Sequence, residues 1–190
     1  KVDFLDAGEN WSRVCTEDGM IGWLQNKRLG ETSVESISRE FEEPVFTHML
    51  KDGSVSLGWH QVTNQEANGR VARILQDTKG GNVISPTWFY LNDNEGNIYS
   101  LASREYVSYC HQNNVEVWAL VSNLENPEAD SAYVLSHTST RDYLTNQIIA
   151  AAIEYDLDGI NLDFEALSGE VGDSYIQFVR ELSLKCENNN

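Results

Sequence analysis

Residues 156–167, with the sequence DLDGINLDFEAL, place an amide and two carboxylates at every second position, between strongly apolar side chains. The polar members are Asn161, Asp163 and Glu165. Because successive side chains of a strand point to opposite faces, this alternation predicts a strand with one polar and one apolar face. Asp163 and Glu165 would then share a face, with their Cα atoms roughly 6.5 to 7 Å apart. Two buried carboxylates that close can divide acid–base work, because like-charge repulsion and burial keep one of them protonated near neutral pH.

The surrounding elements predict an α/β fold. Four apolar strand patterns are each followed by an amphipathic helix pattern, and the strands read SVSLGWHQV, NVISPTWFYL, VEVWALVSN and LDGINLDFEAL. The helices are expected from Asn64 as N-cap to about 80, then over about 103–113, 139–153 and 173–186. Consecutive βα units predict a parallel sheet, either doubly wound or a barrel.

Two observations favour the barrel. No GxGxxG or GxxxxGK[ST] motif follows any strand, so the phosphate loops of nucleotide-binding sheets are missing. Aromatic and polar residues instead cluster near strand ends, where parallel barrels carry their sites. Those residues include Trp59, Trp88, Tyr90 and Asn123. We expect Trp59, Trp88 and Tyr90 to bind substrate by stacking of their aromatic rings, although aromatic residues on barrel strands more often belong to the core.

The first 32 residues predict a small separate β piece. WSRV and IGWL flank Glu17-Asp18-Gly19, a hairpin signal. The pattern W-x-x-V, then G-W-[VIL], then L-G resembles the latter half of a bacterial SH3-like domain; an N-terminal β arm on a larger domain is the alternative. Residues 33–44 are acidic and predict a linker, with a short strand expected over 45–49.

Composition restricts the partners. The 190 residues contain 13 Lys and Arg against 30 Asp and Glu, a net charge of −17, which argues against nucleic acid and anionic membrane surfaces. No apolar run approaches the roughly 20 residues of a membrane helix. Three cysteines without CxxC spacing predict neither a disulfide framework nor a zinc site, and we expect no metal or cofactor. Because the chain begins at Lys1, we expect a fragment or a mature form.

The stretch DGINLDFE resembles the signature D-x-x-D-x-D-x-E of glycoside hydrolase family 18, which lies on the fourth strand of a (β/α)8 TIM barrel. Asp158, Asp163 and Glu165 match the first, third and last acids, whereas Asn161 replaces the second. The Asn form, together with WHQVTN and SPTWFYLND, is similar to the branch of sporulation and cell-wall N-acetylglucosaminidases. The resemblance covers residues 45–190, the first four βα units. A half barrel has open sheet edges, so we expect self-association, completion by another copy, or a longer parent protein.

The resemblance implies roles for these residues. Glu165 would be the general acid and later the base, and Asp163 would orient the substrate's acetamido group, which attacks the anomeric carbon itself. Asn161 cannot ionise, so the row carries one negative charge fewer than the family signature, which has Asp at that position. Asp158, out of phase with the row, is better suited to holding the strand than to chemistry.

The implied function is a glycosidase that cleaves β-1,4-linked N-acetylglucosamine, in peptidoglycan rather than chitin, at a bacterial cell wall, envelope or spore, or otherwise outside the cell. A carbohydrate-binding lectin is the alternative, since the family also contains lectins that have lost the acid. A third interpretation is an interaction domain whose acidic row is structural.

Overall fold

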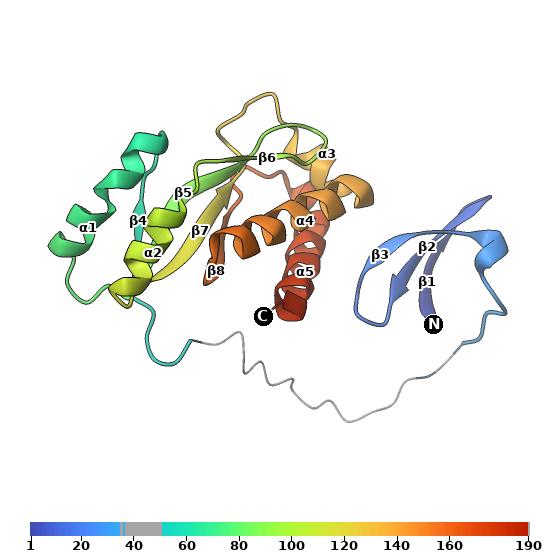
Figure 1. Ribbon diagram of the computed structural model, residues 1–190. Coiled ribbons are helices and arrows are strands. Elements are labelled where there is room, and N and C mark those ends of the chain that lie inside the picture. Colours follow the sequence, from blue (N-terminus) through green and yellow to red (C-terminus); the bar gives the residue numbers. More distant parts are fainter. Residues whose placement is uncertain (35, 37–50, 190) are drawn as a thin grey trace. The chain divides into compact units, whose positions relative to one another are not determined.

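The computed structural model describes residues 1–34, 36 and 51–189 (Figure 1). The predicted linker over 33–44 is therefore covered only at 33, 34 and 36, and the strand expected over 45–49 lies outside the described residues. The N-terminal strands and the α/β part are described separately.

The N-terminal part is an antiparallel sheet of three strands. They are β1 (Val2–Ala7), β2 (Trp11–Thr16) and β3 (Ile21–Gln25), in the order β1-β2-β3. Gly19 adopts a φ of 91° in the turn between β2 and β3, a conformation that side chains disfavour. The predicted hairpin is thus confirmed, whereas its assignment to an SH3-like domain stays a prediction.

The α/β part contains the predicted parallel sheet. Its strands are β4 (Leu57–His60), β5 (Val83–Leu91), β7 (Glu116–Ser122) and β8 (Gly159–Asp163), which pair in this order and run parallel. A short strand that the sequence pattern did not predict, β6 (Ile98–Ser100), pairs antiparallel with the end of β5. Chain order therefore equals sheet order, as in the first four strands of a TIM barrel.

Helices follow each strand of the parallel sheet (Figure 1). They are a 3-10 helix (Gln65–Arg70) leading into α1 (Val71–Asp77), α2 (Arg104–Gln112), α3 (Ser131–Ser136), α4 (Thr138–Tyr155), and a 3-10 turn (Gly169–Val171) leading into α5 (Gly172–Asn189). The predicted N-cap is confirmed, because the Asn64 side chain accepts a hydrogen bond from the Ala67 amide at 3.0 Å. The separate helix α3 was not predicted, because six residues are too few for a helical period to show.

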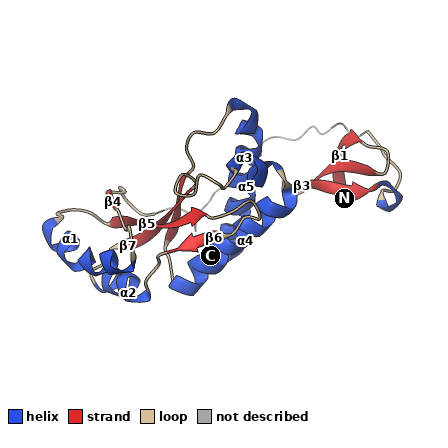
Figure 2. Cartoon of the chain, turned by 90° about the horizontal axis from the view of Figure 1, so that it is seen from above, coloured by secondary structure: helices blue, strands red, loops and turns tan. Residues whose placement is uncertain are grey.

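One face of the sheet packs against helices and forms the core (Figure 2). Trp88 is completely buried, meets the Tyr106 ring of α2 edge to face at 4.9 Å, and donates from Nε1 to Asn68 Oδ1 at 2.8 Å. His60 Nδ1 lies 3.0 Å from the Tyr106 hydroxyl. At the far end of this face Phe164 stacks on Phe178 of α5 at 5.3 Å, as expected for the apolar side of its strand.

The opposite face carries the polar row. The register pairs Trp59 with Ser85, and Ser122 with Asp163, and paired residues of neighbouring parallel strands lie on one face. Asn161 Nδ2 donates to Ser85 Oγ at 3.0 Å although β7 lies between their strands. Strands two apart in a flat sheet are separated by roughly 9 to 10 Å. The contact therefore requires strong curvature toward this face, as in a barrel interior.

Candidate active site

The acidic row straddles the end of β8. Asn161 and Asp163 are half-buried within the strand, whereas Glu165 lies two residues beyond it and is exposed. The expectation of a buried three-residue row within one strand is therefore wrong for this chain. Ser122 and Asp163 form the last aligned pair of β7 and β8. Three residues later Ala166 turns the chain with a φ of 54°.

The backbone of Glu165 is held by the side chain that follows β7. Asn123 Oδ1 accepts from the Glu165 amide at 2.8 Å, and Asn123 Nδ2 donates to the Glu165 carbonyl at 3.1 Å. Asn123 was recognised in the sequence only as one of the polar residues near strand ends. Its partner could not be found from the sequence, since the two residues are 42 positions apart.

A hollow of about 340 Å³ opens on the polar face of the sheet. It is lined by Trp59, Gln61, Thr87, Leu120, Asn161 and Asp163. Trp59 is 69% exposed, so its ring is available to a ligand in this hollow. The structure thus brings Trp59, Asn161 and Asp163 to one surface.

A bulge in β5 directs Tyr90 to the same face. The register between β5 and β7 shifts between Thr87 and Phe89, so that Tyr90 aligns with Ser122, the partner of Asp163. The Tyr90 ring stacks on Tyr99 of β6, with centroids 4.8 Å apart. Ser122 Oγ donates to the Glu125 carboxylate. Burial, then the neighbouring Tyr99 and Glu125, raise the pKa of Tyr90, which therefore stays a neutral hydroxyl.

Tyr99 and Glu125 were missed in the sequence. Tyr99 lies on β6, and three residues are too few to show strand alternation. The stretch Asn94-Glu95-Gly96 is a turn signal, and together with the aromatic residues on either side it could have indicated a hairpin.

Trp88 does not belong to the site, which corrects the sequence-based expectation. It faces the helices, is fully buried, and its indole nitrogen is already bonded to Asn68. No sugar ring can stack on a side chain without exposed surface. The bulge that brings Tyr90 to the polar face of the sheet leaves Trp88 in the core.

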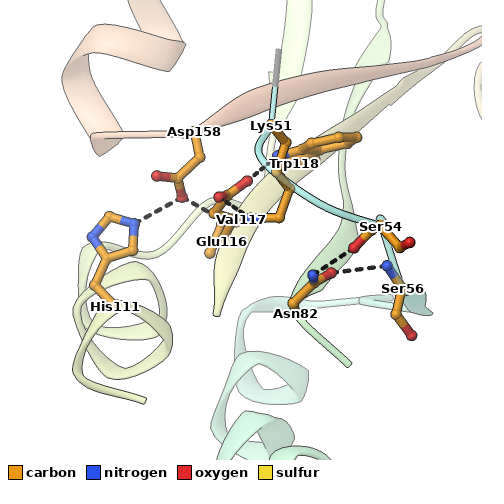
Figure 3. Close-up of polar contacts among 9 residues, drawn as sticks. All are labelled: Lys51, Ser54, Ser56, Asn82, His111, Glu116, Val117, Trp118 and Asp158. Carbon is orange, nitrogen blue, oxygen red and sulfur yellow. Dashed lines mark hydrogen bonds and ion pairs between the residues drawn. The ribbon is translucent and has the colours of Figure 1, made fainter. Parts of the chain in front are cut away.

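Asp158 directly precedes the first residue of β8, whereas Asp163 is the last residue of that strand, so the two aspartates lie at opposite ends of it. Its Oδ2 accepts from the Val117 amide at 2.8 Å and lies 2.8 Å from His111 Nε2 (Figure 3). The next position, Gly159, requires a glycine, because a Cβ there would come within 2.8 Å of the Trp118 side chain. These contacts support a strand-holding role for Asp158.

Within the described residues, no group of three or more His, Cys, Asp and Glu side chains could hold a metal ion.

Burial, and to a smaller extent the Asp158 carboxylate, raise the pKa of the Cys110 thiol to about 12. None of the described helices combines the length and the apolar character that a membrane crossing needs.

Comparison with known proteins places the fold. No protein-family model matches the chain. Among curated proteins it is 28% identical over 107 residues to the uncharacterized glycosylase YvbX of Bacillus subtilis, a match that covers 54% of this chain and 31% of that protein. Among solved structures, the C-terminal domain of a putative chitinase from Desulfitobacterium hafniense matches with a TM-score of 0.61 and 17% identity, over 72% of this chain and 43% of that one.

The α/β part has the fold of the first half of a chitinase barrel. The spore cortex-lytic enzyme SleL of Bacillus megaterium matches with a TM-score of 0.58 and 23% identity, over 70% of this chain and 32% of SleL. A glycoside hydrolase family 18 chitinase from Cycas revoluta, in complex with (GlcNAc)3, matches with a TM-score of 0.55 and 14% identity, over 72% and 42% of the two chains. The resemblance drawn from the DGINLDFE stretch is thus confirmed in the fold, and the chain spans less than half of each of these relatives.

Proposed function

We propose that this chain is the acid-bearing half of a glycosidase of the family 18 type, which cleaves β-1,4-linked N-acetylglucosamine glycans. One observation carries the proposal. The exposed Glu165 carboxylate and the half-buried Asp163 stand at the C-terminal end of the fourth parallel strand, and Asp163 lines the hollow. Sites of parallel barrels lie at that end.

The proposed chemistry uses the substrate's own acetamido group as nucleophile. Glu165 gives its proton to the glycosidic oxygen while the acetamido carbonyl oxygen attacks the anomeric carbon. The bond to the leaving sugar breaks, and a cyclic oxazolinium forms with positive charge on the former amide. Asp163 accepts the hydrogen bond of the amide N–H and stabilises that charge. Water, which loses a proton to the Glu165 carboxylate, then opens the ring with overall retention.

The neighbouring residues support this assignment of roles. Asn161 is held by Ser85 and adds no charge beside Asp163. The neutral hydroxyl of Tyr90 lies on the same face, in line with Ser122 and Asp163. Trp59 offers an exposed aromatic face to the apolar side of a sugar ring.

Peptidoglycan is the favoured substrate over chitin. The support is the Asn form of the motif and the likeness to SleL, which is named a spore cortex-lytic enzyme. We accordingly propose a bacterial envelope or spore as the place of action, with the N-terminal strands as part of an SH3-like module that binds the wall. Self-association through β4 and β8, the end strands of the parallel sheet, stays a prediction.

The test uses the protein at its full natural length with purified peptidoglycan and with chito-oligosaccharides. Mass spectrometry of the released reducing ends identifies the bond that is cut. Glu165→Gln should lower turnover about 10²- to 10⁴-fold, because the amide cannot donate the proton. Glu154→Gln, the same change on the exposed surface of α4, is the matched control.

Three outcomes are distinguished. Peptidoglycan fragments ending in N-acetylglucosamine, lost only in Glu165→Gln, would support a glucosaminidase. Cleavage of chito-oligosaccharides alone would move the substrate to chitin. Binding of either glycan without cleavage by the parent would overturn the proposal in favour of a lectin.

A further inference from the structure

We propose that Asn123 is a positioning residue that fixes the backbone of Glu165 and thereby sets the rate of the proton transfer. The inference rests on the function proposed above. It starts from the position of Glu165, which follows the last aligned residue of β8. An acid at that position receives no hydrogen bonds from the strand ladder of β7 and β8.

The Asn123 side chain replaces the missing ladder. A carboxamide presents one acceptor and one donor side by side, as a peptide group of a neighbouring strand would. Its Oδ1 accepts from the Glu165 amide at 2.8 Å and its Nδ2 donates to the Glu165 carbonyl at 3.1 Å. Both backbone groups of one residue are therefore held by a single side chain, which is only 7% exposed.

The orientation of that carboxamide is itself determined. Nδ2 also donates to Ser131 Oγ at 2.9 Å, at the first residue of α3. Turning the amide by 180° would set its NH₂ against the Glu165 N–H and its oxygen against the Glu165 carbonyl. Only the observed orientation satisfies both backbone contacts.

The segment around Glu165 needs such a restraint. On one side Phe164 stacks against two aromatic rings of α5, Tyr175 at 6.2 Å and Phe178 at 5.3 Å between ring centroids. On the other side Ala166 adopts a φ of 54°, which a residue with a Cβ disfavours. Without Asn123 the chain could relax at Ala166 and carry Glu165 away from Asp163. A displacement of about 1 Å at a reacting group can cost on the order of 10²-fold in rate.

The first test compares Asn123→Ala with Asn113→Ala in the full-length protein. Asn113 Nδ2 also donates to a backbone carbonyl, that of Tyr109 at 2.8 Å, but it follows α2 and belongs to none of the surfaces described for the site. Asn123→Ala should lower kcat roughly 10- to 100-fold with little change in KM, because ground-state binding of the sugar is not affected. Asn113→Ala should keep the parental kcat.

A double-mutant cycle separates positioning from general damage. If Asn123 acts through Glu165, adding Asn123→Ala to Glu165→Gln should not lower turnover further, since the acid is already lost. A further loss of the full 10- to 100-fold would indicate structural damage and would overturn the proposal.

Amide hydrogen exchange supplies a readout that does not need activity. The Glu165 amide should be protected in the parent and in Asn113→Ala, and should exchange faster in Asn123→Ala. Unchanged exchange, or an unchanged kcat in an active parent, would each contradict the positioning role. Failure of the proposed function has a different signature, because the parent itself would then release no product.

Discussion

The two ends of the parallel sheet use polar side chains in opposite ways. At the N-terminal end they fasten the chain to itself: Asp158 accepts from the Val117 amide, Asn82 bridges the backbone of Ser54 and Ser56, and Lys51 pairs with Glu116 (Figure 3). At the C-terminal end Asp163 and Trp59 line a hollow. At this end the Asn123 side chain bonds to the backbone amide and carbonyl of Glu165, the proposed acid.

Asp158 and Asp163 show the difference with the side-chain chemistry held constant. Asp158 directly precedes β8 and its side chain is 31% exposed, whereas Asp163 is the last residue of β8 and is half-buried. The carboxylate of Asp158 is committed to Val117 and His111, whereas that of Asp163 faces the hollow. The role of an acid in this fold is therefore set by the end of the strand at which it stands.

The largest effect that tests this comparison is expected from Asp163→Asn. The amide keeps the shape of the side chain but loses the negative charge that stabilises the developing oxazolinium. Turnover of the glycan should fall roughly a hundredfold or more, with the melting temperature nearly unchanged. The same substitution at Asp158 is the control, because an amide oxygen there can still accept from Val117. Equal losses of kcat at both positions would break the comparison.

The second effect is expected at the opposite end, from Asp158→Ala. Removing the carboxylate leaves the Val117 amide and the His111 ring without their shared acceptor, which should cost about 1 to 3 kcal/mol of unfolding free energy. Denaturant unfolding measures the loss, and kcat per folded molecule should stay close to that of the parent. A stable variant with strongly lowered kcat would instead return Asp158 to the catalytic group.

The alternation in DGINLDFE carried enough information to predict the strand, its faces and its family resemblance. It could not predict where pairing ends, because that depends on the length of β7, a neighbour whose last paired residue is Ser122. For the same reason the exposure of Glu165 and its contact with Asn123 were not foreseen. Periodicity reports the faces of a strand, whereas the ends are decided by partners far away in the sequence.

The error at Trp88 has a different physical cause. Strict alternation through SPTWFYL would put Trp88 and Tyr90 on the same face of the strand. The register shift after Thr87 instead places Trp88 and Phe89 in the core and Tyr90 on the polar face. A β-bulge inserts one residue on one strand only, and it leaves no reliable mark in the strand's own sequence. Aromatic residues near a strand end therefore indicate a site only once the register is known.

A smaller effect, on pH dependence, sharpens the comparison within the C-terminal end. Asn161→Asp adds a second carboxylate two residues before Asp163, and the Ser85 hydroxyl can rotate to donate to it, so that mainly the charge changes. The added negative charge disfavours loss of the proton from a neighbouring acid. The pH optimum of turnover should therefore move upward, roughly by several tenths of a unit to one unit.

The pH–rate profile of Asn161→Asp against the parent is the measurement. Ser85→Ala, which removes the hydrogen bond without adding charge, should leave the pH optimum in place. Superimposable profiles of Asn161→Asp and the parent would show that the charge at position 161 does not influence the acid, contrary to the effect expected of Asn161.

The smallest effect concerns His60, which stands at the C-terminal end of β4 but faces the helices. Burial, and then the positive charge of Arg70, lower the pKa of His60 below its usual value of 6.5. The unfolded chain therefore takes up the proton at a higher pH than the folded one. The resulting stability is fully present above about pH 6.5 and is lost progressively as the pH falls below that value.

Thermal unfolding between pH 7.5 and pH 5 tests this sign. In His60→Gln, which cannot titrate, the fall of the melting temperature toward low pH should be smaller than in the parent, while kcat stays near the parental value. His137→Gln, a change at an exposed histidine, shows whether the effect is specific. If His60→Gln abolished turnover instead, a side chain on the helix-facing side would control the chemistry. The end of the strand at which a side chain stands would then matter more for turnover than the face of the sheet on which it lies. His60→Gln can thus test whether the chemistry at the C-terminal end is confined to the polar face.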